Sequence, residues 1–404
     1  MGTNGGEMTG HCERGPSSAA PVPPLDDDNL LAEILLRLPA LPSSLPRVSL
    51  VSKRWCRLVS DPRFLRGFRS HHQKPPLLGF FLPDFCGNIE FTSMLDPPDL
   101  IPAARFSLRA GRGSKVLGCC HGRVLVLEEQ HFLVWDPVTG DLRHVAFPPA
   151  FDDKMMFVVD GGVVCTAGDQ GHVHGACHSD PFQVVLIGQD RARFFACVYS
   201  SETGAWGNLL STMRPLDTMT VCPTCSSTLI RNSICLFLIG EKVAIFEFDW
   251  DRQNLAVIDV PSDAHDFDAF IRGECQFLIT PADSGSLSFV LLAVFSIRVW
   301  KMTTNGDGVA RWMLGNTIEL SNLLSLRPVV NGTPLRILGL DEDGNVMFKL
   351  NSSGVVFMVH LESMQFKKLS QKWPYRSCHP FTSFCTPGMH VSAGHDEVEI
   401  LRGA

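Results

Sequence analysis

Residues 25–68 read LDDDNLLAEILLRLPALPSSLPRVSLVSKRWCRLVSDPRFLRGF, and apolar residues recur in them at helical spacing. In the first part, apolar residues lie one, three or four positions apart, which predicts one apolar stripe along a helix. The stripe is formed by Leu30, Leu31, Ile34, Leu35 and Leu38. Three aspartates precede the stripe, where carboxylates complement the free N–H groups of a helix N-terminus. Pro39 ends the helix because proline removes a hydrogen-bond donor.

A second helical stretch begins near Ser43 and ends at Asp61-Pro62. One apolar face is expected along it, formed by Val48, Val51, Trp55, Leu58 and Val59. The pattern leaves open whether this stretch is one helix or two helices joined at residues 50–52. About three short helices in about 45 residues bury too little apolar surface to be stable alone. We therefore expect this unit to contact a partner or the rest of the chain.

Composition limits the class of protein. The chain has 404 residues, of which 45% are hydrophobic and 19% charged, as in a folded globular protein. Its net charge of −7 argues against unspecific binding to nucleic acid. Residues 1–24 are rich in Gly, Ser and Pro and are expected to be a disordered leader without a signal peptide. We therefore expect a protein of the cytoplasm or nucleus, with no membrane span and with reduced cysteines.

From Pro75 to the end, short runs rich in β-branched and aromatic residues alternate with turn residues, which predicts an all-β region. A strand followed by a turn recurs every 50 to 65 residues or so, near the period of four-stranded propeller blades. The five occurrences are Val134–Gly140, Val198–Gly204, Phe246–Arg252, Val299–Asn305 and Val359–Met364. We predict a β-propeller over residues 75–404, with stacked β-sandwiches as the competing architecture.

Three motifs within residues 30–64 resemble the F-box: a leucine-rich helix ending in Pro39, the segment VSLVSKRW up to Trp55, and SDP before Phe64. Residues 75–81, PPLLGFF, and residues 379–387, HPFTSFCTP, are similar to plant F-box proteins whose remainder is a propeller-like associated domain. The resemblance implies an α+β chain: an F-box of about three helices at residues 25–70, then a kelch-like β-propeller.

The resemblance also implies partners. The F-box would dock on a Skp-family adaptor, which bridges to a cullin, and the propeller would bind an unknown target protein for ubiquitination. By position in the motif, the adaptor-binding and packing residues are Leu30, Leu31, Ile34, Leu35, Pro39, Leu45, Val48, Val51 and Trp55. Two departures from the pattern are Ser52, where cysteine is common, and Cys56, where arginine is frequent. The alternative function is a propeller scaffold for protein interactions without a role in ubiquitination.

Residues 47–74 carry eight Lys or Arg against one acid, Asp61. This reversal of sign in an acidic chain fits either an acidic partner, whose docking it would speed, or a solvated helix surface. We do not expect a nucleic-acid site there, because exposed aromatic residues are not interleaved with the basic ones.

Cysteine and histidine spacing suggests one metal hypothesis. Cys222 and Cys225 form a CxxC pair, and His172, His174, Cys177 and His178 form a second cluster. Together they could make a closed zinc site. Some 45 residues separate the two segments, however, and loops between strands are rich in such residues. We take the loop interpretation, so no metal or cofactor is predicted.

We predict no enzymatic activity. Gly111–Lys115 lacks the full phosphate-loop spacing and is expected to be a surface turn. Cys119, Cys120 and His121 are neighbours on a strand and its turn, which points them apart. Residues 341–344, DEDG, are expected to be a hairpin turn.

Overall fold

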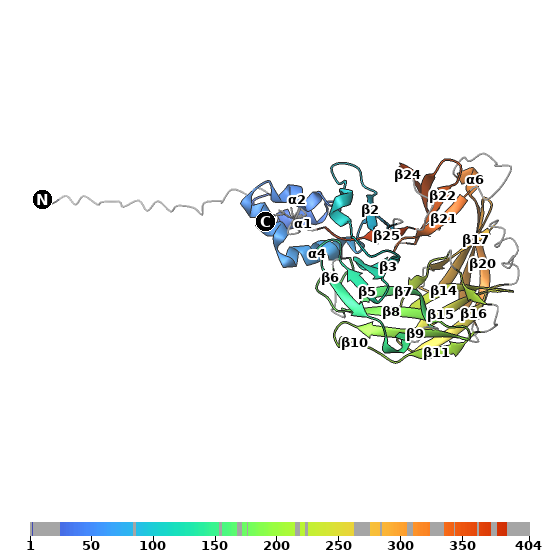
Figure 1. Cartoon of the computed structure of the whole chain (residues 1–404). Helices are drawn as coiled ribbons and strands as arrows, with labels where there is room; N and C mark the ends of the chain where they lie inside the picture. The colour runs from blue at the N-terminus through green and yellow to red at the C-terminus, as the bar shows by residue number, and fades with distance from the viewer. Residues whose placement is uncertain are drawn as a thin grey trace, which may run out of the picture.

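A computed structural model gives the fold of the chain. It describes residues 2, 25–83, 86–152, 156–167, 172–175, 177–214, 219–222, 225–261, 275–282, 285–304, 310–323, 335–342, 344–361, 363–372 and 378–385. The expected leader at residues 1–24 lies almost wholly outside this set. Four helices form a unit at one side of a large β domain (Figure 1).

The helical unit contains α1 (Asp28–Leu36), α2 (Ser44–Ser49), α3 (Lys53–Ser60) and α4 (Pro62–His72). The side chain of Asp27 caps α1 by accepting hydrogen bonds from two backbone N–H groups. Ser52 caps α3 in the same way, through a 3.2 Å hydrogen bond from the N–H of Trp55. The second helical stretch is therefore two helices, α2 and α3, joined at residues 50–52. With α4, the described helical unit has four helices, where about three were expected.

The β domain is a propeller of six blades, each a small antiparallel sheet. Blade 2 contains β3 (Lys115–Cys120), β4 (Arg123–Leu127), β5 (His131–Trp135) and β6 (Leu142–Ala146). Blade 3 contains β7 (Phe157–Cys165), β8 (Phe182–Gln189), β9 (Arg193–Ser200), β10 (Ala205–Trp206) and β11 (Leu210–Met213). Blade 4 contains β12 (Thr220–Val221), β13 (Thr228–Ile230), β14 (Ser233–Ile239), β15 (Val243–Asp249) and β16 (Asn254–Asp259).

Two further blades follow. Blade 5 contains β17 (Cys275–Pro281), β18 (Leu287–Ala293), β19 (Ser296–Thr304) and β20 (Ala310–Glu319), and the short helix α6 (Leu320–Leu323) comes next. Blade 6 contains β21 (Leu335–Leu340), β22 (Asn345–Leu350), β23 (Val355–His360) and β24 (Phe366–Lys372). Each of the five repeats found in the sequence begins in the strand that is third in the order of its sheet, namely β5, β9, β15, β19 or β23.

Blade 1 closes the ring with strands from both ends of the domain. It pairs β1 (Leu77–Pro83) with β2 (Ile89–Ser93) on one side and with β25 (His379–Thr382) on the other. Phe81 and Phe381 pack at 5.2 Å between ring centroids, so the pairing also brings large aromatic side chains together. The ring is therefore closed by the pairing of the last described strand, β25, with the first, β1.

Apolar cores lie between the blades. Strand β14 is buried along its whole length because both of its faces are covered. Cys235, Phe237 and Ile239 pack toward blade 5, while Ile234 and Leu236 pack toward blade 3. Similar clusters fill the other four junctions between neighbouring blades, including the one between blades 6 and 1. The β-propeller is confirmed and the sandwich alternative is wrong.

Residues 111–114 form a turn before β3, which already includes Lys115, and Asp341, Glu342 and Gly344 lie in the turn between β21 and β22, so both predicted turns are present. Within the described part of the chain, no helix is both long and apolar enough to cross a bilayer.

Candidate functional site

The structure divides the nine residues predicted to bind an adaptor into two groups. Four of them fill the core of the helical unit with exposed fractions of 9% or less: Leu31, Leu35, Leu45 and Val48. Trp55 is half-buried against this core. Leu30, Ile34, Pro39 and Val51 are exposed. The buried residues therefore hold the helices together, and only the exposed ones are free to meet a partner.

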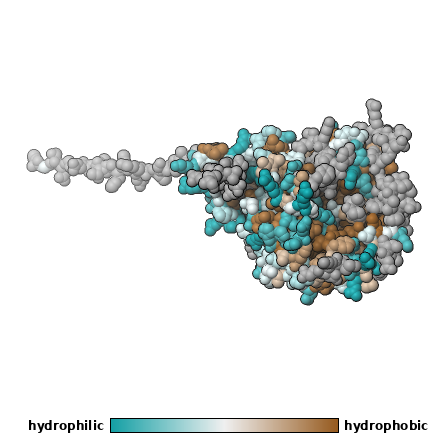
Figure 2. Space-filling view, viewed as in Figure 1, coloured by the Kyte–Doolittle hydropathy of each residue, from teal (hydrophilic) through white to brown (hydrophobic). Residues whose placement is uncertain are grey.

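Five large apolar side chains remain on the surface of the helical unit, and we call them the docking face: Leu25, Leu30, Ile34, Leu50 and Val51. Their exposed fractions run from 46% for Ile34 to 84% for Leu50. Leu30 and Ile34 are four residues apart on α1 and so share one side of that helix. In the space-filling view, brown apolar residues are interspersed with teal ones over the helical unit (Figure 2).

Arg54 joins the two parts of the docking face. Its guanidinium donates to the Leu25 carbonyl oxygen at 2.7 Å and to the Asp28 carboxylate at 2.8 Å. The start of α3, which follows Val51, is thereby held against the start of α1, which precedes Leu30. One basic residue of the 47–74 segment thus has a structural role, whereas Lys53, Arg57, Arg63 and Arg66 are exposed.

The helical unit also rests on the propeller. The backbone N–H of Ser43 donates to the Asp99 carboxylate at 2.8 Å. Burial lowers the pKa of Arg69 on α4, although Cys177 and Asp180 of blade 3 oppose the shift. Only residues 73–76 separate α4 from β1, so the two parts are joined by a short connection.

A cavity of about 920 Å³ lies where the inner strands of the blades meet. The linker contributes Gln73, Lys74 and Pro75 to its lining, and β3 and β7 contribute Gly118, Gly161 and Gly162. This cavity is large enough to receive a side chain or a short peptide segment of a target.

Burial keeps four ionisable groups of the cavity lining uncharged. Burial raises the pKa values of Cys119 and Cys120 well above the usual value for a thiol. Burial likewise lowers the pKa of His121 to about 3 and that of His379 to about 4. A nucleophilic cysteine requires a thiolate, so these two cysteines are not activated, in agreement with their interpretation as part of a strand.

The structure groups the candidate metal ligands differently from the sequence hypothesis. Cys222 and Cys225 lie in blade 4 with their sulfur atoms 2.9 Å apart, and Cys225 contacts the Phe277 carbonyl oxygen in blade 5. The structure does not bring them to the histidines. Among the described residues, the group that could hold a metal is Cys165, His172, His174 and Cys177. Cys165 was not among the residues of the sequence hypothesis, although the spacing Cys-x6-His-x-His-x2-Cys indicates it.

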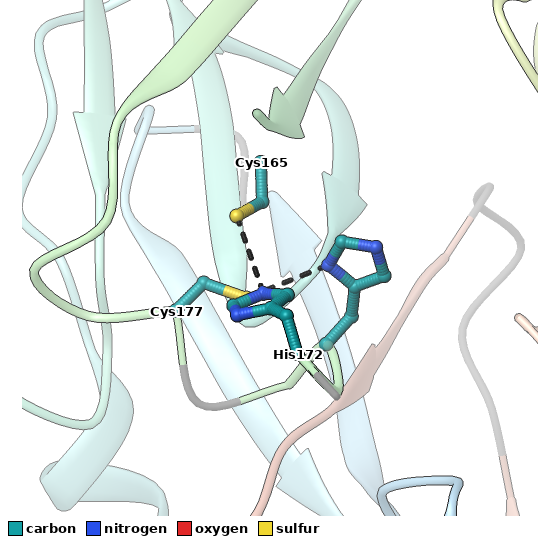
Figure 3. A group of neighbouring side chains, drawn as sticks. Cys165, His172 and Cys177 are labelled. Atoms are coloured by element: carbon teal, nitrogen blue, oxygen red, sulfur yellow. Dashed lines mark hydrogen bonds between the residues drawn. The ribbon is translucent and has the colours of Figure 1, made fainter. Parts of the chain in front are cut away.

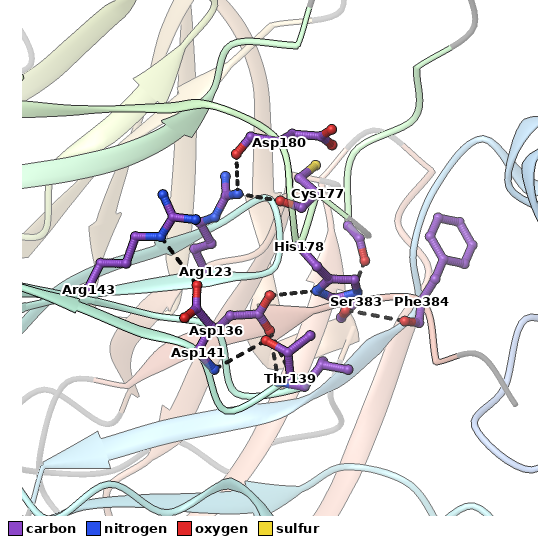
Figure 4. Close-up of polar contacts among 12 residues, drawn as sticks. Arg123, Asp136, Thr139, Asp141, Arg143, Cys177, His178, Asp180, Ser383 and Phe384 are labelled. Atoms are coloured by element: carbon purple, nitrogen blue, oxygen red, sulfur yellow. Dashed lines mark hydrogen bonds and ion pairs between the residues drawn. The ribbon is translucent and has the colours of Figure 1, made fainter. Parts of the chain in front are cut away.

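His178, the other histidine of that cluster, has a different partner. Its Nδ1 lies 2.6 Å from the Asp136 carboxylate, which also accepts hydrogen bonds from the N–H groups of Val138 and Thr139 (Figure 4). Burial raises the pKa of Asp136, but the hydrogen bond and charge of His178 outweigh it, so the pKa lies below its usual value. This pair fastens the loop before β8 to the β5–β6 turn of blade 2.

Comparison with known proteins agrees with both parts of the architecture. A family model for the F-box domain matches residues 26–67. A second model, described as F-box protein AT5G49610-like, beta-propeller, matches residues 115–388. The chain belongs to this family of F-box proteins. The earlier resemblance is thereby confirmed, and F-box domains generally bind Skp-family adaptors.

One curated relative of this F-box protein is "F-box protein At5g03970" of Arabidopsis thaliana, 21% identical over 398 residues and matched over 90% of both chains. Among solved structures, the Dos1 propeller covers 72% of this chain and 68% of its own, with a TM-score of 0.38 and 9% identity. A protein of unknown function from Desulfotomaculum acetoxidans covers 76% and 84%, with a TM-score of 0.37 and 15% identity.

Proposed function

We propose that this F-box protein is the substrate-recognition subunit of a Skp–cullin–F-box ubiquitin ligase of the cytoplasm or nucleus. It would dock on a Skp-family adaptor through the docking face, present a target protein on the propeller, and catalyse nothing itself. The observation that carries the proposal is the division of the F-box into a closed core and a separate exposed apolar face.

The docking face is well suited to a protein partner. The core of the helical unit is already filled by residues such as Leu31 and Leu35, and the exposed leucines lie outside it. Covering a fully exposed leucine or isoleucine gains about 1.5–3 kcal/mol, so five side chains that are 46% to 84% exposed offer a substantial driving force. The exposed cations Arg63 and Arg66 on α4 would steer an acidic adaptor toward the helical unit.

The propeller is suited to hold a target because its cavity and turns present many different side chains on a rigid ring. The short linker, residues 73–76, fixes the ring relative to the F-box. A target on the propeller would therefore keep a constant position relative to the ligase. That supports ubiquitin transfer, which requires a target lysine to reach the charged enzyme.

A reconstituted reaction tests the proposal. The full chain would be combined with a Skp-family adaptor, a cullin with its RING subunit, and activating and conjugating enzymes, and ubiquitin conjugates of the chain itself would be measured. We expect conjugates that depend on the adaptor and disappear in the double variant Ile34→Asp with Val51→Asp. The matched control is Met313→Asp with Leu314→Asp, which changes two exposed apolar residues on blade 5 and should keep the activity.

Two results would contradict the proposal. If the folded wild type did not bind the adaptor, docking on a Skp-family adaptor through the F-box would be ruled out. Adaptor binding without any adaptor-dependent conjugate would instead favour the scaffold function.

A further inference from the structure

Two cysteines and two histidines converge at the end of β7. Cys165 is the last residue of that strand, and His172, His174 and Cys177 come from the segment that leads to β8. Their possible ligand atoms all lie within 4.8 Å of one another. Figure 3 shows the side chains of Cys165, His172 and Cys177 pointing toward a common space from different stretches of backbone.

The distances within the group match those of a tetrahedral zinc site. With Zn–S bonds of about 2.3 Å and Zn–N bonds of about 2.0–2.1 Å, a tetrahedron places sulfur and nitrogen ligands about 3.6 Å apart. Nε2 of His172 lies 3.5 Å from Sγ of Cys165 and 3.4 Å from Sγ of Cys177. Nδ1 of His174 lies 3.7 Å from Sγ of Cys177. Three ligand pairs thus already have the required spacing.

Neighbouring groups orient both imidazoles. Oδ2 of Asp180 lies 3.8 Å from Nδ1 of His172, where a carboxylate favours a proton on Nδ1 and leaves Nε2 free to bind a metal. The ring of His121 stacks on that of His174 at 3.6 Å and 9°. The backbone N–H of Cys165 donates to Nδ1 of His121, so the same ring also holds the first cysteine. These contacts are those of supporting residues around a metal site.

The loop is anchored independently of the four side chains. The Arg123 guanidinium of blade 2 donates to the carbonyl oxygens of Cys177 and Asp180. The Ser383 hydroxyl and the Phe384 N–H, just after β25, both donate to the Gly175 carbonyl oxygen at 2.8 Å. Blade 2, blade 3 and the closing strand therefore meet at this loop and hold its backbone in place.

We propose that Cys165, His172, His174 and Cys177 bind a structural Zn²⁺ ion that fastens the closure of the propeller beneath the F-box. Four protein ligands fill the tetrahedron, which is typical of structural zinc rather than of a catalytic ion with an open position. Two thiolates balance the charge of Zn²⁺, so the site as a whole is neutral. Gly175 lies against Pro75 of the linker, so the ion would also stabilise the junction with the helical unit.

Metal analysis of the purified full chain tests this proposal. The chain would be expressed with added zinc, purified under reducing conditions, and analysed by mass spectrometry of its elements. We expect about one zinc per chain in the wild type and less than about a tenth in Cys165→Ser and in His172→Asn, since either change leaves three ligands. The matched control is Cys225→Ser, which alters the CxxC pair of blade 4 and should retain the zinc.

A second measurement keeps the test valid if a variant fails to fold. Zinc would be removed from the wild type by a chelator, and cobalt would be added to the folded apo protein. Tetrahedral coordination with thiolates predicts strong visible absorption and a sulfur-to-metal charge-transfer band. We also expect chelation to lower the Tm, and zinc to restore it.

Three outcomes would overturn the proposal. The first is a folded wild type with less than about a tenth of an equivalent of zinc and no tetrahedral cobalt spectrum. The second is loss of zinc in Cys225→Ser but not in Cys165→Ser. The third is about one zinc per chain retained in both Cys165→Ser and His172→Asn.

Discussion

Oδ2 of Asp136 lies 2.6 Å from Nδ1 of His178, so a buried acid of blade 2 holds the loop that precedes β8 in blade 3. Only 4% of the Asp136 side chain is exposed, and its other oxygen accepts hydrogen bonds from the turn between β5 and β6. One carboxylate therefore shapes a turn within one blade and joins two blades.

Asp136→Ala should destabilise the fold by about 2–4 kcal/mol, because it leaves His178 and two turn N–H groups without their acceptor. Urea unfolding followed by fluorescence would measure the change. Asp136→Asn is the matched control, because its amide oxygen can still accept from the turn, and it should cost clearly less. Equal losses in the two variants would mean that the hydrogen bonds to the turn contribute little and that the pairing with His178 accounts for the loss.

Phe381→Ala should destabilise the ring closure by about 3–5 kcal/mol. Phe381 is buried in β25, and its ring packs against Phe81, Phe91 and Phe106. Thermal unfolding of the full chain would measure the loss. The control is Phe366→Ala on β24, since Phe366 is 47% exposed and should change stability little. A Phe381 variant as stable as the control would show that closure does not depend on this cluster.

Gly175→Ala should loosen the contact between the linker and the propeller. A Cβ at Gly175 would lie 2.6 Å from Pro75, and the backbone φ of +94° also disfavours alanine. Gly140→Ala separates the two effects, because Gly140 has a φ of +79° but open space around it. The control should lose about 1–2 kcal/mol from backbone strain alone. Comparison of Tm values should show a larger loss for Gly175→Ala; equal losses would exclude a tight contact with Pro75.

Charge reversal tests the two interpretations of the basic 47–74 segment. Arg63→Glu with Arg66→Glu should slow association with the adaptor about tenfold or more at low salt and much less at high salt. Stopped-flow fluorescence would give the rates. Arg112→Glu, an exposed change in the turn before β3, should leave them unaltered. Rates that are insensitive to all three changes would favour the solvated-surface interpretation.

Much of the architecture could be predicted from local pattern. The strand and turn at Val134–Gly140 recur because each blade folds the same way, so five blades were visible in the sequence. Blade 1 was not, because Leu77 pairs with Thr382 at the far end of the chain and no local period records that pairing. The join at Ser52 also stayed open, because a helix cap depends on backbone geometry as well as on residue type.

The site residues were harder to predict. Leu30 and Leu31 are adjacent and chemically identical, yet one is 49% exposed and the other fully buried, which only the packing of α1 against the other helices decides. The CxxC pair attracted the metal hypothesis through its spacing, whereas the ligand set that the structure brings together includes Cys165, at the end of a strand. Cys165 belongs to this group because the fold brings it close to the other three residues across a loop, not because it is adjacent to them in sequence.

The central claim is that the docking face binds a Skp-family adaptor. Isothermal titration of an adaptor into the full chain tests it most directly, using wild type, Leu30→Ala with Ile34→Ala, and the control Met313→Ala with Leu314→Ala. We predict micromolar or tighter binding for wild type and control, and a loss of about 2 kcal/mol or more, roughly thirtyfold in Kd, for the docking-face variant. No binding by the folded wild type, or equal affinity in all three proteins, would contradict the account.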